Sequence, residues 1–508
     1  MRTCRTVGTL AAASFISIAG QAAHAEITAQ QVWDDWQAYL QNFGYTVEAQ
    51  ETESAGGLTV SDISMSFAVP EEDVDIRITM SEMTLTNRGD GSVSVTMPEV
   101  MPLVIQVDSP DDEDVEVALD YTTRGFEMII AGDAEAMTYT YASEVVGVAL
   151  TDLTVEGEKV DIGTANFEIA DMAGTAEMTI GNLRKVVQTL TAGPVTYAMD
   201  IKDPEGTEGR MVIEGRAENL KMQGTTTIPV DMDMADMAAA MKAGFGFEGG
   251  YEIGPGSTSF DFQDAEEAFQ GTTSSDGGNF DVAMDSERLR YAAASRNLAM
   301  EFTASDLPFP VGVTLQEATF DLGMPLGKSE EPQDFALSFA MRDFTMSDMI
   351  WALFDPEGKL PRDPATLALD LSGKASLLVD IFDAAEMEAV EDGAEMPGEL
   401  QSLALNNLEV RAAGAELTGK GEVEIDNTDM TSYDGMPKPV GAVNLGLVGA
   451  NALLDKLVEM GLLSNDDAMG ARMMMGLFAV AGDGEDTLTS EIRFTEDGQV
   501  LANGQRLK

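Results

Sequence analysis

Apolar and polar residues alternate along much of the chain with a period of two. This alternation is typical of antiparallel strands, which bury one face of a sheet and leave the other face wet. It is clearest at Val74, Ile76, Ile78, Met80; at Val93, Val95, Met97; at Val115, Val117, Leu119, Tyr121; and at Leu367, Leu369, Leu371. Turn signals suited to hairpins occur at Asp90-Gly91, Asp497-Gly498 and Asn503-Gly504. The pattern predicts a mainly β protein.

A second pattern interrupts the alternation, because two apolar-x-apolar triplets are separated by two polar residues. The polar pairs are Ser61-Asp62, Ser81-Glu82, Thr151-Asp152, Arg342-Asp343 and Asn406-Asn407. On a helix the triplets would share no face, and on a regular strand the second triplet would move to the opposite face. One extra residue, a β-bulge, restores the face and bends the strand. Unless the repeats are chance matches, we expect long, bent antiparallel strands in a curved sheet, a β-rich α+β fold.

Helical spacing is found at several places between the strands. Residues 28–44 combine a possible cap at Thr28, an apolar stripe that includes Trp33 and Trp36, and a possible stop at Gly44. Further helices are expected at residues 231–245 and 347–354. A helical pair is expected at residues 451–463 and 466–482, with Gly461 as a break. We expect these helices to pack against the sheet.

The first 25 residues have the layout of a secretory signal peptide. Arg2 and Arg5 precede an apolar run from Leu10 to Gly20, which is too short to span a bilayer. Ala23 and Ala25 then supply a small-x-small cleavage site. A buried first helix is the alternative. We predict cleavage after Ala25 and a periplasmic protein, and no later apolar run is long enough for a transmembrane helix.

The predicted cleavage has a chemical consequence, because the only cysteine, Cys4, and the only histidine, His24, lie before it. A chain without these residues cannot form disulfides or Cys/His zinc sites. It also lacks the side chains of thiol nucleophiles and Ser-His-Asp triads. We therefore expect a non-enzymatic protein.

The chain is strongly acidic, with 29 Lys+Arg against 89 Asp+Glu and a net charge of −60. Cleavage would remove two basic residues, so that 27 − 89 = −62. This charge disfavours nucleic acid and anionic lipid surfaces as partners. The hydrophobic fraction of 44% is ordinary for a folded chain. Residues 271–279, GTTSSDGGN, are the best loop candidate and divide the chain into regions 26–270 and 281–508, although one continuous domain is the alternative.

Motifs for known chemistry were sought along the chain. It contains no Gly-x-Ser-x-Gly, Ser-x-x-Lys, phosphate-loop or dinucleotide fingerprint. Residues 426–435 and 481–486 are acidic but lack EF-hand spacing, so we interpret them as acidic turns. A carboxylate pair could hydrolyse glycosides, but the many acids single out no pair. No catalytic, cofactor-binding or metal-binding residue is predicted, and no cofactor is expected.

Methionine is unusually common, with 32 residues. Methionine side chains adapt to irregular apolar partners, so they could fill the core or line a groove for an acyl chain. The methionines on apolar faces are Met65, Met80, Met83, Met97, Met346 and Met473 to Met475. A curved sheet with such a lining favours a lipid or another apolar ligand.

Several segments together carry a family resemblance. They are QQVWDDWQAYLQNFGY, AAGAELTGKGEVEI, PVGAVNLGLVGANALLDKLVEMGLL and FTEDGQVLANGQRL. The chain resembles the alphaproteobacterial periplasmic family known as domain of unknown function 2125, which implies no particular activity. The strands and the Gly-rich C-terminal part are more distantly similar to AsmA-like envelope proteins. That similarity implies a role in envelope lipid homeostasis.

Three functions follow as hypotheses. The first is a periplasmic carrier that holds a lipid or another apolar ligand in a concave sheet. The second is an envelope scaffold or assembly module that binds another protein. The third is a carboxylate-based hydrolase, which requires two converging carboxylates in a cleft.

Overall fold

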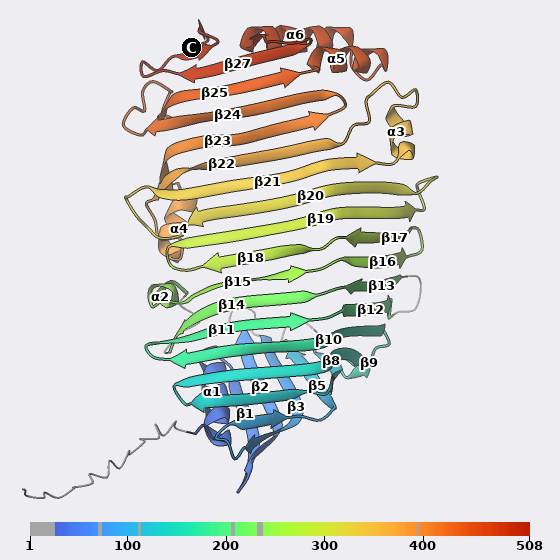
Figure 1. Cartoon of the computed structure of the whole chain (residues 1–508), viewed down its shortest axis with the longest axis vertical. Helices are drawn as coiled ribbons and strands as arrows, with labels where there is room; N and C mark the ends of the chain where they lie inside the picture. The colour runs from blue at the N-terminus through green and yellow to red at the C-terminus, as the bar shows by residue number, and fades with distance from the viewer. Residues whose placement is uncertain (1–25, 70–73, 110–112, 205–208, 231–236, 394–395) are drawn as a thin grey trace, which may run out of the picture.

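A computed structural model describes residues 26–69, 74–109, 113–204, 209–230, 237–393 and 396–508 (Figure 1). Strands hold 62% of the residues and helices 12%, in one large antiparallel sheet with six helices in this part of the chain. The expectation of a mainly β fold is therefore confirmed. The expected signal segment, residues 1–25, lies outside the described residues.

The N-terminal strands fold behind the lower end of the sheet in Figure 1, where they are drawn in blue. Two long strands, β3 and β8, each pair with two short strands on one side: β3 with β5 and then β4, and β8 with β7 and then β6. The elements are α1 (Ala29–Asn42), β1 (Thr46–Ser54), β2 (Gly57–Val69), β3 (Val74–Asn87), β4 (Val93–Thr96), β5 (Val100–Asp108), β6 (Val115–Arg124), β7 (Glu127–Asp133), β8 (Ala136–Val155) and β9 (Glu158–Lys159).

The middle of the sheet consists of two parallel rows of short strands between long strands β10 and β19. One row is β11, β14, β15 and β18, and the other is β12, β13, β16 and β17. β10 and β19 each pair with both rows. The bounds are β10 (Gly163–Ile180), β11 (Leu183–Ala192), β12 (Val195–Lys202), β13 (Arg210–Ala217), β14 (Leu220–Pro229), β15 (Gly246–Ile253), β16 (Gly256–Gln263), β17 (Ala268–Ser275), β18 (Gly278–Met284) and β19 (Arg288–Ala304).

The prediction of a loop at residues 271–279 is wrong. Gly271 to Ser275 belong to β17 and Gly278 starts β18, so only residues 276–277 cross between the two rows. Both strands pair with β19, and the sheet continues through this stretch. Turn-forming residues are present because the chain must change rows here within two residues.

The C-terminal part is a meander in which each long strand pairs with the next. Its strands are β20 (Val311–Pro325), β21 (Gln333–Met346), β22 (Ala365–Leu377), β23 (Gly398–Ala412), β24 (Ala415–Asp426), β25 (Lys438–Val448), β26 (Val480–Ala481), β27 (Thr487–Phe494), β28 (Val500–Ala502) and β29 (Gln505–Arg506). The remaining helices are α2 (Met237–Lys242), α3 (Asp348–Phe354), α4 (Ala384–Glu391), α5 (Ala450–Glu459) and α6 (Asn465–Phe478).

Most of the expected helices are present. α1 begins after Thr28, whose side chain forms a capping box with Gln31, and Gly44 follows its end at φ 82°. α3 and α5 match their expected positions, and Gly461 breaks the pair at φ 73°. α6 ends at Phe478, earlier than expected, because Val480 and Ala481 pair with β27 as the short strand β26. α2 covers part of its expected range, of which residues 231–236 lie outside the described residues. α4 was not expected.

The polar pairs lie inside strands, as predicted. Register shifts occur where β1 passes Ser61-Asp62, where β6 passes Thr151-Asp152, and at Arg342-Asp343 and Asn406-Asn407. Asp62 and Asp343 adopt φ of 48° and 54°, which turns the strand locally. Ser81-Glu82 differs, because Glu82 lies opposite Ser61 and β3 stays in register with β2. The bent-strand interpretation is confirmed at four of the five pairs.

The main core lies at the N-terminal end, where the curled strands surround α1. Val32 and Trp33 of α1 are fully or nearly fully buried against Val60 of β2, Leu85 of β3 and Ile130 of β7. A smaller cluster joins Tyr39 and Phe43 of α1 to Ile228 of β14 and to α2. The stripe predicted on the first helix is thus a core face.

Candidate apolar binding face

One face of the sheet carries an apolar row that crosses its middle from strand to strand. Directly opposed residues of antiparallel strands share a face, and their Cβ atoms are close. Successive partners along this row, from β14 to β23, are Met222, Tyr251, Phe280, Ala293, Phe320, Phe339, Leu369 and Leu408. We call this set the apolar row.

A second line of apolar partners runs beside the apolar row on the same face. Its members are Val282, Tyr291, Leu322, Leu337, Leu371 and Leu405. Each lies two residues along its strand from a member of the apolar row or, at the Asn406-Asn407 bulge, three residues. The bulge therefore keeps Leu405 and Leu408 on one face, which is the consequence that the sequence pattern predicted.

An open hollow of about 610 Å³ lies on this face. Tyr251, Phe280, Phe320, Phe339 and Met341 line it, together with small residues such as Ala293 and Gly278. The side chains are well exposed for apolar groups, at 43% for Tyr251, 41% for Phe320 and 47% for Met341. The small residues lower the floor between the large side chains, so the hollow is a ready surface for an apolar ligand.

The apolar surface continues beyond the hollow into the second row of short strands. Ser275 of β17 lines the hollow, and Phe269 has the same parity on that strand and therefore the same face. Phe269 stacks on Phe260 with ring centroids 5.0 Å apart and lies 5.0 Å from Phe302. Asn297, at φ 49°, lies between Ser295 and Leu298 of β19, where the apolar positions change parity. The turn at Asn297 thus joins the two apolar areas.

Helices cover the same face at both ends. At the N-terminal end, Arg184 of β11 contacts α1, and it has the same parity as Leu190, the partner of Met222 in the apolar row. At the C-terminal end, Met474, Met475 and Phe478 of α6 lie over Leu445 and Leu447 of β25. The apolar face is therefore bordered by helices at both ends and open in its middle.

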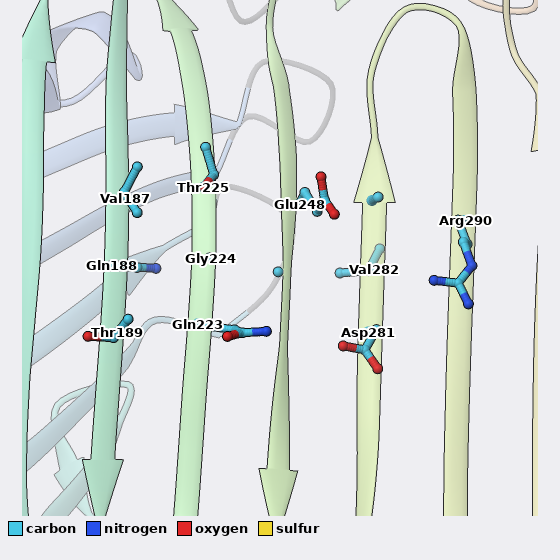
Figure 2. A pocket seen from close by; sticks show the side chains of 12 residues that line it. Val187, Gln188, Thr189, Gln223, Gly224, Thr225, Glu248, Asp281, Val282 and Arg290 are labelled. Atoms are coloured by element: carbon cyan, nitrogen blue, oxygen red, sulfur yellow. The ribbon is translucent and has the colours of Figure 1, made fainter.

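The opposite face is polar and carries a hollow of about 290 Å³. Figure 2 shows Gln223, Glu248, Asp281 and Arg290 on neighbouring strands around it. Arg290 Nη2 donates to Asp321 Oδ2 at 2.6 Å, and this hydrogen bond raises the pKa of the guanidinium. Asp281 accepts a hydrogen bond from Asn279 Nδ2 at 2.9 Å. Arg290 and Asp281 therefore have partners on their own face, and the two faces differ in chemistry.

The methionines expected to line an apolar groove have different fates. Met80 and Met83 pack against the N-terminal core, whereas Met474 and Met475 line the space under α6. Met473 points outward and is 71% exposed. Sequence reasoning did not single out Tyr251, Phe280 or Phe320. The sequence marks these residues only as apolar positions in alternating strands, on the face that carries the hollow.

The described residues contain no group of three or more His, Cys, Asp or Glu side chains placed to hold a metal ion. Among the same residues, no helix is long and apolar enough to cross a membrane.

Comparison with known proteins gives one finding. No curated protein and no solved structure matches the chain. The sequence model of one family, described as "Uncharacterized protein conserved in bacteria (DUF2125)", matches residues 247–507, which include β16 to β29 and most of the apolar row. The chain belongs to this bacterial family.

Proposed function

We propose that the protein is a periplasmic carrier that holds the acyl chain of a lipid on its apolar face. The observation that supports this proposal is the open hollow of about 610 Å³ on the apolar row, with Tyr251, Phe320 and Met341 each more than 40% exposed. Large contiguous apolar patches on a protein surface commonly mark ligand-binding grooves or interaction sites.

The chemistry of the face favours an alkyl chain over a ligand rich in polar groups. The strands beneath the hollow pair on both sides, so their backbone groups already have hydrogen-bond partners. A ligand on this face therefore gains mainly side-chain contact. Each buried methylene contributes about 0.8 kcal/mol. Met341 can adapt to chains of different shape, because its thioether side chain is flexible.

The proposed periplasmic location rests on the first 25 residues. Arg2 and Arg5, the apolar run from Leu10 and the Ala23-x-Ala25 site have the order of a signal peptide. N-terminal sequencing of the protein purified from a bacterial periplasmic fraction should begin at Glu26. A protein that retains Met1 and stays in the cytoplasm would contradict this location.

Bound lipid should be detectable directly. Organic extracts of the full-length protein, purified without detergent, should contain lipid in a fixed ratio to protein by mass spectrometry. Phe320→Glu places a charge in the hollow and should reduce the bound lipid at least fivefold. Thr314→Glu is the matched control on β20. Thr314 is exposed and forms a hydrogen bond with Thr345, and it lies beyond the point opposite Asn297 where the apolar positions change parity, so it is on the polar face.

The same variants separate the carrier from the scaffold hypothesis. Lipid-free wild-type protein that also fails to bind the apolar dye N-phenylnaphthylamine would overturn the carrier proposal. Equal loss of lipid in Phe320→Glu and Thr314→Glu would show that the hollow is not the site. Cross-linking in cells to a stoichiometric protein partner, lost in Phe320→Glu, would favour the scaffold instead.

A further inference from the structure

A second hollow lies at the C-terminal end of the apolar face, between α6 and the sheet. Its volume is about 330 Å³. The sheet side is formed by Leu417, Leu445, Leu447, Leu488 and Ile492, and the helix side by Met474, Met475 and Phe478. Figure 1 shows α6 and α5 at this end of the molecule, beside β27. We call this space the end pocket.

The lining of the end pocket suits a hydrocarbon group. The lining includes two hydroxyl residues, Thr489 and Ser490, and Ser490 Oγ donates to the carbonyl of Phe478 at 2.6 Å. Well-packed cores leave few voids larger than a water molecule. An apolar cavity of about 150 Å³ in another protein accepts benzene. The end pocket has about twice that volume, enough for the last part of an alkyl chain.

The end pocket is continuous with the apolar row. Leu408, the last residue of that row, faces Gly419 on β24, and Gly419 faces Leu445 in the pocket. A Cβ at Gly419 would lie 2.9 Å from Leu445 Cδ2 and 3.2 Å from Leu408 Cβ. The two leucines therefore occupy the space that a side chain at position 419 would need. An apolar path therefore leads from the open hollow to α6.

This path is long enough to hold an acyl chain. Phe339 lies on β21 and Leu445 on β25, four strand spacings apart. At about 4.8 Å per strand the path is roughly 19 Å. One leaflet of a bilayer has a hydrocarbon layer about 15 Å thick.

Polar contacts hold α6 in place over the pocket. The carbonyl of Phe478 accepts hydrogen bonds from Ser490 and from Asn503 Nδ2, at 2.6 and 2.9 Å. Arg472 donates to Asp455 of α5 at 2.6 Å and to Asn451 at 3.2 Å. These hydrogen bonds fix α6 relative to the sheet and to α5, so the pocket is a permanent part of the folded structure.

We infer that the end pocket receives the terminal segment of an alkyl chain whose remainder lies along the apolar row. This inference rests on the proposed carrier function and adds a site that measures chain length. Short chains fit on the open hollow alone, whereas long chains also fill the end pocket and gain its apolar contacts.

The test uses uncharged monoglycerides, because the acidic protein would repel free fatty acids. Octanoyl, dodecanoyl and hexadecanoyl monoglycerides are titrated against the full-length protein by displacement of N-phenylnaphthylamine. Wild-type affinity should rise with chain length. Met475→Trp fills the end pocket and should lower the ratio of hexadecanoyl to octanoyl affinity at least tenfold. Met473→Trp, on the exposed side of the same helix, should leave the ratio within twofold.

The outcomes separate the two proposals. Absence of monoglyceride binding to wild-type protein overturns the carrier function and the end pocket together. Binding that Phe320→Glu weakens, with an unchanged length ratio in Met475→Trp, overturns the end pocket alone. Leu488→Phe is a second filling variant, to be used if Met475→Trp does not give the wild-type circular dichroism spectrum.

Discussion

Arg184 of β11 and Asp35 of α1 form a two-point ion pair, with Nη2 to Oδ1 at 2.6 Å and Nη1 to Oδ2 at 3.0 Å. Their side chains are only 9% and 10% exposed. The guanidinium also lies 5.1 Å from the centre of the Tyr39 ring. The pair joins the first helix to a strand 149 residues later, so it fixes the helix that borders one end of the apolar face.

Asp35→Ala should destabilise the N-terminal end of the protein markedly. Loss of one partner leaves the Arg184 charge buried and unpaired, which costs about 3–5 kcal/mol. Trp33 and Trp36 lie on the same helix and report its unfolding by fluorescence in urea. Asp200→Ala is the control, because Asp200 and Arg210 form an exposed pair, and it should change the transition little. Equal midpoints for the two variants would contradict the structural role of the buried pair.

The bend at Asp62 should tolerate glycine but not a β-branched residue. Asp62 is exposed and adopts φ 48° inside β2, a conformation that favours glycine, asparagine and aspartate. Asp62→Val should lower the free energy of unfolding by about 1–2 kcal/mol, the usual cost of the left-handed conformation. Asp62→Gly should be close to wild type in the same urea titration. If both variants behave alike, the local conformation at this bulge does not determine stability.

The bulges could be predicted because their cause is local. Leu403, Leu405, Leu408 and Val410 show the change in parity directly in the sequence, and one face can be kept only if the strand gains a residue. Thr28 and Gly44 are equally local, since capping depends on a few adjacent residues. α4 was missed because AAEMEAVE has no clear apolar stripe.

The pairing of strands and the hollow could not be predicted, because both depend on contacts between distant segments. The short strand β17 ends at Ser275, and the short strand β18 begins at Gly278. The two are collinear because both pair with the long strand β19. Tyr251 and Phe339 line one hollow from strands far apart in the sequence. Alternation assigns each residue to a face but leaves its neighbours on adjacent strands undetermined.

The stability of the protein at alkaline pH should depend on the ionisation of the Tyr139 hydroxyl. Burial is the main cause that raises the pKa of Tyr139 to about 12, and the nearby Asp35 carboxylate raises the pKa further. A hydrogen bond from Trp36 Nε1 at 3.3 Å has the opposite effect. Because the folded pKa exceeds the unfolded value of about 10, the tyrosine favours the fold below pH 10. This contribution is lost as the pH rises from about 10 to about 12.

The measurement for Tyr139 compares wild type with Tyr139→Phe. Thermal melts should show that wild type loses more stability than the variant between pH 10 and pH 12. In an alkaline titration followed by ultraviolet absorbance, Tyr139→Phe should have one tyrosine fewer among those that ionise well above pH 10. A tyrosinate signal from residue 139 near pH 10, without unfolding, would contradict the burial argument.

Salt should stabilise the protein, because self-repulsion outweighs the loss of ion pairs. The 29 basic residues can neutralise at most 29 of the 89 acidic residues, which leaves 60 negative charges without a basic partner. Exposed pairs such as Lys159–Asp152 weaken in salt but contribute little. The Debye length falls from about 30 Å at 0.01 M to about 8 Å at 0.15 M, so repulsion across the surface is screened first. The melting temperature should therefore rise between about 0.01 and 0.15 M sodium chloride, and a fall over this range would mean that the ion pairs dominate.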